Sequence, residues 1–186
     1  FNTIDAQAAS KYTIYVNRKT NLVNVTDSRT GKLVKAMYCS TGKNYRTISG
    51  TYNTTAKYQW RALIHGVYGQ YSTRIHGPYL FHSVPYYSVN KSKVSTKEYN
   101  KLGLQASAGC IRLAVTDAKW IYDNCRIGTK VVIGESRTLK KPARPKVKVS
   151  TKRKAWWDPT DPDTRNPYRP KLTLKKKGKR TIAYGS

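Results

Sequence analysis

The sequence predicts a mainly β domain with one or two short helices, followed by an extended, basic C-terminal tail. Three runs rich in β-branched and aromatic residues, 12–16, 22–25 and 33–40, are separated by polar turns, which is the pattern of β strands. Residues 43–73 show little helical periodicity. From about residue 135 the composition shifts to proline and basic residues. A chain of 186 residues can hold one ordinary domain with such an appendage.

The first half of the chain predicts a linker and then a β meander. Residues 1–10 are small and polar without an apolar period, so we expect a linker there. The three strand-like runs are joined by the polar turns 17–21 and 27–31, and three antiparallel strands are the simplest arrangement. Residues 43–73 carry tyrosine, threonine and glycine, which favour further short strands and long loops.

The second half of the predicted domain contains a core strand, a long loop and a helix. Leu80 and Phe81 form a short apolar run with His82 at its end. Residues 85–101 make a loop that is long for a compact domain, which favours a functional lid or rim. Thr116 is the expected N-cap of a helix, and residues 128–133 predict a turn and a final core strand.

The tail, residues 136–186, is the densest source of charge. It carries 17 basic and 3 acidic residues (17 − 3 = +14), whereas the preceding 135 residues carry 19 and 6 (19 − 6 = +13). Its six prolines predict extended structure. The adjacent indoles Trp156 and Trp157 need apolar neighbours. We therefore expect residues 156–170 to dock on the preceding domain, residues 11–135, while the surrounding lysines stay solvated.

The net charge of +27 predicts that any diffuse partner is a polyanion. Nucleic acid and an anionic cell-wall polymer both fit, but the sequence has no C2H2, leucine-zipper, RNP-like or KH-type motif, so no nucleic acid is expected. No run approaches the roughly 20 apolar residues of a membrane helix. Because the chain begins at Phe1, we expect an upstream signal peptide or anchor, and membrane contact only through it.

The number and spacing of the cysteines limit which disulfides the chain can form. Cys39, Cys110 and Cys125 are too few and too scattered for a disulfide framework or a zinc ribbon. One disulfide between Cys39 and Cys125 is possible, and two unpaired structural thiols fit the sequence at least as well. Either arrangement leaves Cys110 free.

The segment 107–113, Ser-Ala-Gly-Cys-Ile-Arg-Leu, holds the candidate nucleophile Cys110. A nucleophilic thiol needs nearby positive charge or a base, and backbone N–H groups directed at the oxyanion it creates. Gly109 lacks Cβ and can adopt a positive-φ turn that would direct its own N–H and that of Cys110 toward one point. The alternative is that Cys110 is a small buried hydrophobe at a strand end.

His82 is the preferred base among the three histidines. The apolar run before it would fix its backbone, whereas His65 and His76 lie beside glycines. Ser83, through its hydroxyl, or a nearby backbone carbonyl would hold the imidazole Nδ1–H. Arg112 has two compatible roles: it could bind a substrate carboxylate and favour the thiolate, or it could anchor the loop to backbone carbonyls.

Neither a metal nor another cofactor is expected. The spacings of 11 and 6 between the three histidines fit no common zinc pattern, and no carboxylate lies near them in sequence. Glu98 is the only acidic residue between Asp27 and Asp117, which argues against a catalytic carboxylate pair.

These motifs together resemble the catalytic signature of L,D-transpeptidases of the YkuD family, in the branch found in Gram-positive bacteria. The resemblance covers roughly residues 11–170. The segments that carry it are 15–17, 39–42, 69–71, 74–75, 81–86 (Phe-His-Ser-Val-Pro-Tyr), 107–113, 117–122, 128–129 and 157–162 (Trp-Asp-Pro-Thr-Asp-Pro).

The resemblance implies a sandwich-like β domain, exported and wall-associated, that acts on peptidoglycan stem peptides in cell-wall biogenesis and cell shape. Cys110 would attack the carbonyl of the third stem residue and expel the terminal D-alanine, with His82 as the base. A side-chain amine of a neighbouring stem would then form a 3→3 cross-link, or water would give carboxypeptidase activity. Carbapenems typically acylate such enzymes. The rival is a catalytically idle wall-binding protein of the same fold.

The resemblance also implies an oxyanion and substrate-binding set: Ser107, Ala108, Gly109, Arg112 and Tyr71. Three departures from the family pattern are visible. Ala108 stands where many members carry histidine, which should tune the site. Residues 47–52 depart from a Thr-Pro-x-Gly-x-Phe pattern, which predicts a looser loop. The long gap between His82 and Cys110 predicts a larger lid.

Overall fold

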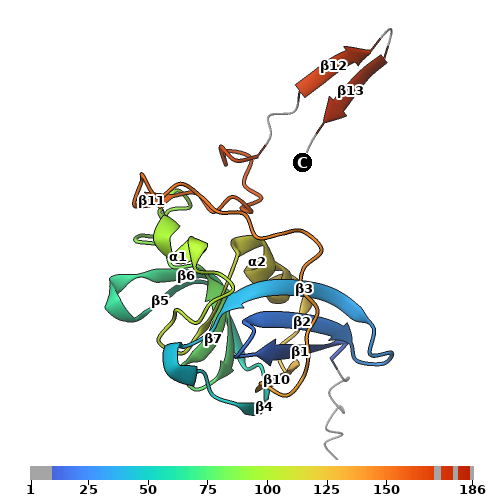
Figure 1. Cartoon of the computed structure of the whole chain (residues 1–186), viewed down its shortest axis with the longest axis vertical. Coiled ribbons are helices and arrows are strands. Elements are labelled where there is room, and N and C mark those ends of the chain that lie inside the picture. Colours follow the sequence, from blue (N-terminus) through green and yellow to red (C-terminus); the bar gives the residue numbers. More distant parts are fainter. Residues whose placement is uncertain (1–9, 170–172, 178–179, 185–186) are drawn as a thin grey trace, which may run out of the picture.

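The computed structural model describes residues 10–169, 173–177 and 180–184, and this part of the chain is mostly β. Its main sheet has nine strands in the order β4-β10-β1-β2-β3-β9-β7-β6-β5. Their bounds are β1 Tyr12–Asn17, β2 Leu22–Asp27, β3 Leu33–Ser40, β4 Gly50–Asn53, β5 Ala56–Ala62, β6 Tyr68–His76, β7 Tyr79–Ser83, β9 Ile111–Leu113 and β10 Lys130–Gly134. The sheet is curled, with α2 beside it (Figure 1). The predicted mainly β fold is confirmed.

The remaining elements are short. The helices are α1 Thr96–Asn100 and α2 Val115–Asn124, and two 3₁₀ turns cover Lys43–Tyr45 and Ile64–Gly66. Two small antiparallel pairs lie outside the main sheet: β8 Val94–Ser95 with β11 Ala155–Trp156, and β12 Thr173–Lys177 with β13 Arg180–Tyr184. The predicted linker, apart from Ser10, and Pro170 lie outside the described residues. No helix in the described ranges is long and apolar enough to span a membrane.

The predicted antiparallel meander is confirmed for β1, β2 and β3. Alternate side chains of a strand point to opposite faces, and those on the inner face, such as Ile14, Val23 and Met37, are fully buried in the core. Helix α2 packs Ala118 and Ile121 into the same core. The core is therefore enclosed between the curled sheet and this helix.

The two cysteines outside the 107–113 segment are structural. Cys39 and Cys125 are free thiols, fully buried in the core. Burial raises the pKa of both thiols, that of Cys125 to about 12, so neither is ionised at neutral pH. Of the two alternatives left open by the sequence, the structure has the unpaired thiols.

Strands β7 and β9 run parallel, and this pairing accounts for the long loop between them. Parallel neighbours cannot be joined by a tight turn and need a crossover of a dozen or more residues. Here the crossover contains β8 and α1. The register pairs Phe81 with Ile111 and His82 with Arg112. Cys110, which directly precedes β9, is thereby brought next to Leu80 of β7, two residues before His82.

The tail docks on the domain from residue 135 onward, well before the predicted 156–170. Asn17 donates two side-chain hydrogen bonds to the carbonyls of Glu135 and Arg137, at 3.2 and 2.9 Å. Asn24 exchanges hydrogen bonds with the backbone of Lys140 in both directions, each 2.9 Å long. Buried amides need such partners, so the change of composition near residue 135 does not mark the end of packing.

The tail also caps α2, which corrects the predicted N-cap. Thr116 is not the N-cap, because the helix begins at Val115 with Ala114 in the capping position. Asp158 from the tail is fully buried and accepts a 2.8 Å hydrogen bond from the Val115 N–H. Thr160 accepts one of 3.2 Å from the Thr116 N–H. A distant carboxylate thus supplies the acceptor that the local sequence lacks.

Replacing Asp158 by alanine is expected to lower the free energy of unfolding by about 2–4 kcal/mol. The change removes the acceptor for the N–H groups of Val115 and Thr160 at a fully buried position. Urea denaturation followed by circular dichroism measures the loss. The matched control is Asp123→Ala on the same helix, whose half-exposed ion pair with Lys119 should contribute below about 0.5 kcal/mol. Equal losses for both variants would contradict the cap.

Candidate active site

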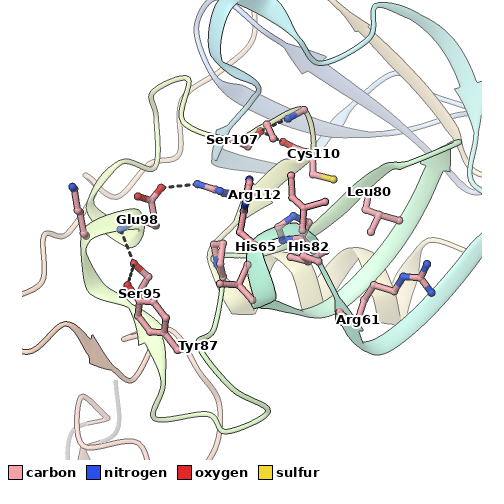
Figure 2. Close-up of a pocket in the computed structure, with 18 of the residues that line it drawn as sticks. Arg61, His65, Leu80, His82, Tyr87, Ser95, Glu98, Ser107, Cys110 and Arg112 are labelled. Atoms are coloured by element: carbon pink, nitrogen blue, oxygen red, sulfur yellow. Dashed lines mark hydrogen bonds and ion pairs between the residues drawn. The ribbon is translucent and has the colours of Figure 1, made fainter.

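A pocket of about 1150 Å³ opens beside the end of β7 and the start of β9. It is lined by four parts of the domain, which are the β5–β6 hairpin, β7, the crossover with α1 and the segment around Cys110. The tail also lines it, through Thr151 and Lys154. Figure 2 shows Cys110, His82 and Arg112 grouped at one side, with Glu98 and Tyr87 across from them on the crossover. The crossover therefore forms a rim of the pocket, in the place expected for a lid.

Cys110 is partly exposed, and its Sγ lies 3.4 Å from the carbonyl oxygen of Pro78, to which the thiol donates. Burial raises the pKa of the thiol. The Leu80 backbone N–H opposes this shift, as do the charges of Arg112 and Arg74, because all three favour the thiolate. The resting thiol is protonated, in an environment that supports the anion once a base removes the proton.

The loop before Cys110 is fixed by two hydroxyl groups. Ser107 Oγ donates to the Cys110 carbonyl at 2.5 Å and accepts from the Gly109 N–H at 3.0 Å. Thr47 Oγ1 donates to the Gly109 carbonyl at 2.6 Å and accepts from the Gly42 N–H at 2.8 Å. The departure at 47–52 predicted a loose loop, and this is wrong for Thr47, which is fully buried between both partners.

The conformation of Gly109 agrees with the expectation in part. Its φ of 158° is positive, as predicted, and lies close to the extended region. Its N–H is engaged by Ser107 and is not directed at the pocket together with that of Cys110. Glycine is favoured here for two reasons: L side chains rarely adopt this φ, and a Cβ would lie 3.1 Å from Cε1 of Tyr79, which is closer than an ordinary contact.

Replacing Thr47 by valine is expected to slow acylation of Cys110 about tenfold and to destabilise the fold by about 1–3 kcal/mol. Valine keeps the shape but leaves the buried Gly42 N–H without its acceptor and releases the Gly109 carbonyl. Acylation rates by mass spectrometry and thermal denaturation measure the two effects. Thr51→Val, at an exposed position on β4, is the control and should change neither. Unchanged acylation in Thr47→Val would contradict the role assigned to this clamp.

His82 is held in one orientation at the end of β7. It is only 2% exposed, and its Nδ1 lies 2.5 Å from the Ser83 carbonyl oxygen. Since a carbonyl only accepts, Nδ1 carries the proton and Nε2 keeps a lone pair. The backbone carbonyl of Ser83 therefore orients the ring, because the Ser83 hydroxyl is occupied: it accepts from the Gln70 N–H and donates to the Val84 carbonyl.

The electrostatics of His82 keep the imidazole neutral. Desolvation lowers its pKa to about 4, the Ser83 carbonyl opposes that shift, and the charge of Arg112 reinforces it. The ring also needs a glycine behind it, because a Cβ on Gly69 would lie 2.9 Å from the His82 Cβ. A neutral imidazole with a fixed tautomer has the properties of a general base.

Arg112 anchors the rim. Its Nη1 donates to Glu98 on α1 at 2.6 Å and to the Ala106 carbonyl at 3.3 Å. Lys101 pairs with the other oxygen of Glu98 at 2.8 Å. Burial raises the pKa of Glu98, but these two cations outweigh it, so that the net shift is downward. The anchoring role is present, and Arg112 Nε is buried without a hydrogen-bond partner in the described part of the chain, so it remains able to donate.

The other predicted residues are divided between the pocket and the core. Ser107, Ala108 and Gly109 line the pocket with Cys110 and Arg112. Tyr71 does not line it, because its ring packs 5.4 Å from that of Tyr122 on α2. The substrate-binding role predicted for Tyr71 is therefore wrong for this pocket.

Sequence reasoning missed several residues of the pocket. His65, set aside as the base, lines it from the β5–β6 hairpin, while His76 stacks near Tyr52 with ring centres 5.0 Å apart. Glu98 could have been found, because it is a lone acidic residue in a long basic stretch. Lys154 had no signal, since a tail 44 residues beyond Cys110 (154 − 110) reaches the pocket only through tertiary packing. In the described ranges, no three His, Cys, Asp or Glu residues gather as a metal site.

The class of the protein follows from the fold and the pocket: a curled β domain with a neutral imidazole on one strand and a thiol directly before the neighbouring parallel strand. A family model for the L,D-transpeptidase catalytic domain, YkuD, matches residues 11–133. The chain belongs to this family.

One curated protein and one solved structure are similar to this chain in sequence. The putative L,D-transpeptidase YciB of Bacillus subtilis (strain 168) is 53% identical over 62 residues, which are 33% of this chain and 31% of that protein. A fused Zn-dependent amidase/peptidase/peptidoglycan-binding domain-containing protein from Clostridium acetobutylicum ATCC 824 is 32% identical, with a TM-score of 0.52, over 66% of this chain and 51% of that chain. The match thus spans about a third to a half of these relatives.

A more distant structure shares the fold. The L,D-transpeptidase LdtMt1, solved in complex with imipenem, is 18% identical over 67% of this chain and 59% of that chain, with a TM-score of 0.55. At this identity the similarity concerns the fold alone.

Proposed function

We propose that this domain is a peptidoglycan L,D-transpeptidase that forms 3→3 cross-links through a thioester on Cys110, with His82 as the general base. The observation that carries the proposal is the parallel register of β7 and β9, which sets a neutral, oriented imidazole beside the strand that begins directly after Cys110. Membership of the L,D-transpeptidase family supports stem peptides as the substrate.

The first half-reaction begins with a proton transfer. The thiol leaves the Pro78 carbonyl and gives its proton to Nε2 of His82. The Leu80 N–H and the charge of Arg112 stabilise the thiolate, which attacks the carbonyl carbon of the third stem residue. The resulting oxyanion collapses and breaks the C–N bond. His82 returns its proton to the departing amine of D-alanine, and a thioester remains on Cys110.

The second half-reaction uses the same groups in reverse. A side-chain amine of a neighbouring stem attacks the thioester carbonyl and loses a proton to His82 Nε2. Collapse then releases the thiolate, which is reprotonated, and leaves a new amide bond. Water in place of the amine yields a free tripeptide, which is the carboxypeptidase outcome.

The pH dependence of acylation should report the depressed pKa of His82. The base must be neutral, so the acylation rate should fall as the pH drops through about 4 and stay level from about 5 to 7. The measurement is the second-order rate constant with imipenem across this range. A limb near the ordinary imidazole pKa of about 6.5 would contradict a desolvated base.

The experiment that tests the proposal uses purified disaccharide-tetrapeptide as both donor and acceptor. Mass spectrometry should detect a dimer that has lost one D-alanine, and tandem fragmentation should place the new bond between two third residues. Incubation with imipenem should add one molecule to the protein, and peptide mapping should locate it on Cys110. Tripeptide alone would identify a carboxypeptidase. No product and no adduct would favour the idle wall-binding protein.

We also propose that the chain works outside the cell on the wall, where its net charge of +27 binds anionic polymers. Such binding is electrostatic and should weaken as ionic strength rises, because the Debye length shrinks to about 8 Å at 0.15 M salt. Cosedimentation with purified walls tests this. Retention that is insensitive to salt, or unchanged after the anionic polymers are stripped, would contradict it.

A further inference from the structure

The charged groups around the pocket are unequal in sign. Among the residues that the structure describes, Glu98 is the only acidic one that lines it, against five basic residues: Arg61, Arg74, Lys97, Arg112 and Lys154. The ion pairs of Glu98 with Arg112 and Lys101 already neutralise that carboxylate. The remaining positive charge is therefore available to a ligand.

Two of these cations stand free on the rim side of the pocket. Lys97 on α1 and Lys154 in the tail are exposed, and neither forms an ion pair with a carboxylate in the described ranges. Arg74 differs, because it donates to the Gly77 carbonyl and to the Tyr58 hydroxyl. Arg61 is also exposed without an ion pair in the described ranges, and its guanidinium lies 4.6 Å from the centre of the Tyr58 ring. Lys97 and Lys154 are thus the unpaired basic groups beside the crossover.

Lys154 reaches the pocket because the tail is paired with the rim. Strand β11 begins at the next residue, and its register sets Ala155 opposite Ser95 of β8. The Thr96 hydroxyl donates to the carbonyls of Arg153 and Lys154, at 2.7 and 3.2 Å, and the Thr96 N–H donates to the Lys154 carbonyl at 3.2 Å. These bonds fix the backbone of Lys154 against the start of α1.

A contact with an aromatic ring of the pocket also orients the side chain of Lys154. Its Nζ lies 4.7 Å from the centre of the Tyr87 ring, within cation–π range, and Tyr87 itself lines the pocket. The Tyr87 hydroxyl contacts Ser95 Oγ at 3.4 Å, which ties the ring to the same strand. An ammonium held on an aromatic wall keeps its charge and its N–H donors for a ligand in the pocket.

We propose that the tail completes the substrate pocket, and that Lys154 with Lys97 forms a subsite for a free carboxylate of the stem peptide. The inference rests on the proposed function and adds a substrate class to it. Stem peptides with a free carboxylate at this subsite should bind in preference to stem peptides in which the same group is a carboxamide. A carboxylate accepts charge-assisted hydrogen bonds from an ammonium, whereas the neutral amide does not gain this attraction.

The direct test is binding to the Cys110→Ala variant, which cannot turn the ligand over. Two synthetic stem tetrapeptides that differ only in one carboxylate or carboxamide are titrated by calorimetry. The carboxylate form should bind about fivefold more tightly, and the ratio should approach one in the added variant Lys154→Gln and recover in Lys154→Arg. Lys152→Gln, with the same charge change two residues away and outside the pocket lining, should keep the ratio.

A turnover assay in the otherwise unaltered protein distinguishes donor from acceptor as the source of the carboxylate. Tetrapeptides with an acetylated side-chain amine act only as donors, and tripeptides without D-alanine act only as acceptors. Each is supplied in carboxylate and carboxamide form. A preference in either arm that disappears with Lys154→Gln supports the subsite and assigns it to that stem.

The outcomes separate this inference from the proposed function. Equal binding of the two tetrapeptides, or a preference that survives Lys154→Gln, overturns the subsite even if cross-links form. A preference in binding that depends on Lys154, with no turnover of any peptide, supports the subsite and overturns the transpeptidase. The preference should also decline as salt is raised, because the interaction is electrostatic.

Discussion

Replacing Cys110 by alanine is expected to abolish the imipenem adduct and to lower cross-linking by about 10⁴-fold or more. The variant has no substitute nucleophile, because Cys39 and Cys125 are fully buried and their thiols are held protonated. Intact-mass spectrometry after incubation with imipenem measures the adduct, and chromatography of stem peptides measures the product.

The controls for this experiment are the two structural cysteines. Cys39→Ala and Cys125→Ala remove buried sulfur from the core and should lower stability, but each should keep the adduct. Circular dichroism of Cys110→Ala should match that of the unaltered protein, since this side chain lies at the pocket surface. An adduct that persists in Cys110→Ala would show that the nucleophile has been misassigned.

Local patterns were sufficient to predict the first three strands. The runs of β-branched and aromatic residues in 12–40, with polar turns between them, predict β1, β2 and β3, because both signals are visible in the sequence itself. The glycine before Cys110 has the positive φ that the sequence predicted, and the absence of a Cβ also leaves room for the Tyr79 ring. Such predictions succeed where the residues that determine a feature lie within the same short segment.

Other features depend on partners that are distant in sequence. The register that pairs His82 with Arg112 is set by the core packing of β7 and β9 across a long crossover. The acceptor at the start of α2 comes from Asp158, whereas the local sequence predicts Thr116 as the N-cap. Tyr71 carries a family motif, yet its ring packs against Tyr122. No periodicity or composition in the sequence encodes these contacts.

The tail links the fold to the proposed chemistry. Asp158 holds it on α2, Thr96 holds it on the rim, and Lys154 between them lines the pocket. A segment that composition marks as a basic appendage is thus part of the wall of the site. The positive charge of the tail can therefore take part in two interactions. The solvated lysines can bind a wall polymer, and Lys154 can bind a single carboxylate in the pocket.

Replacing His82 by alanine is expected to slow acylation by imipenem by about 10²–10⁴-fold. The thiol remains, but no neutral imidazole accepts its proton, and burial keeps the thiol pKa high. Time-resolved mass spectrometry measures the rate. His65→Ala is the matched control, because His65 lines the same pocket from an exposed 3₁₀ turn, and it should keep most of the rate, as should His76→Ala. Equal losses in all three variants would mean that the pocket, and not one base, controls the reaction.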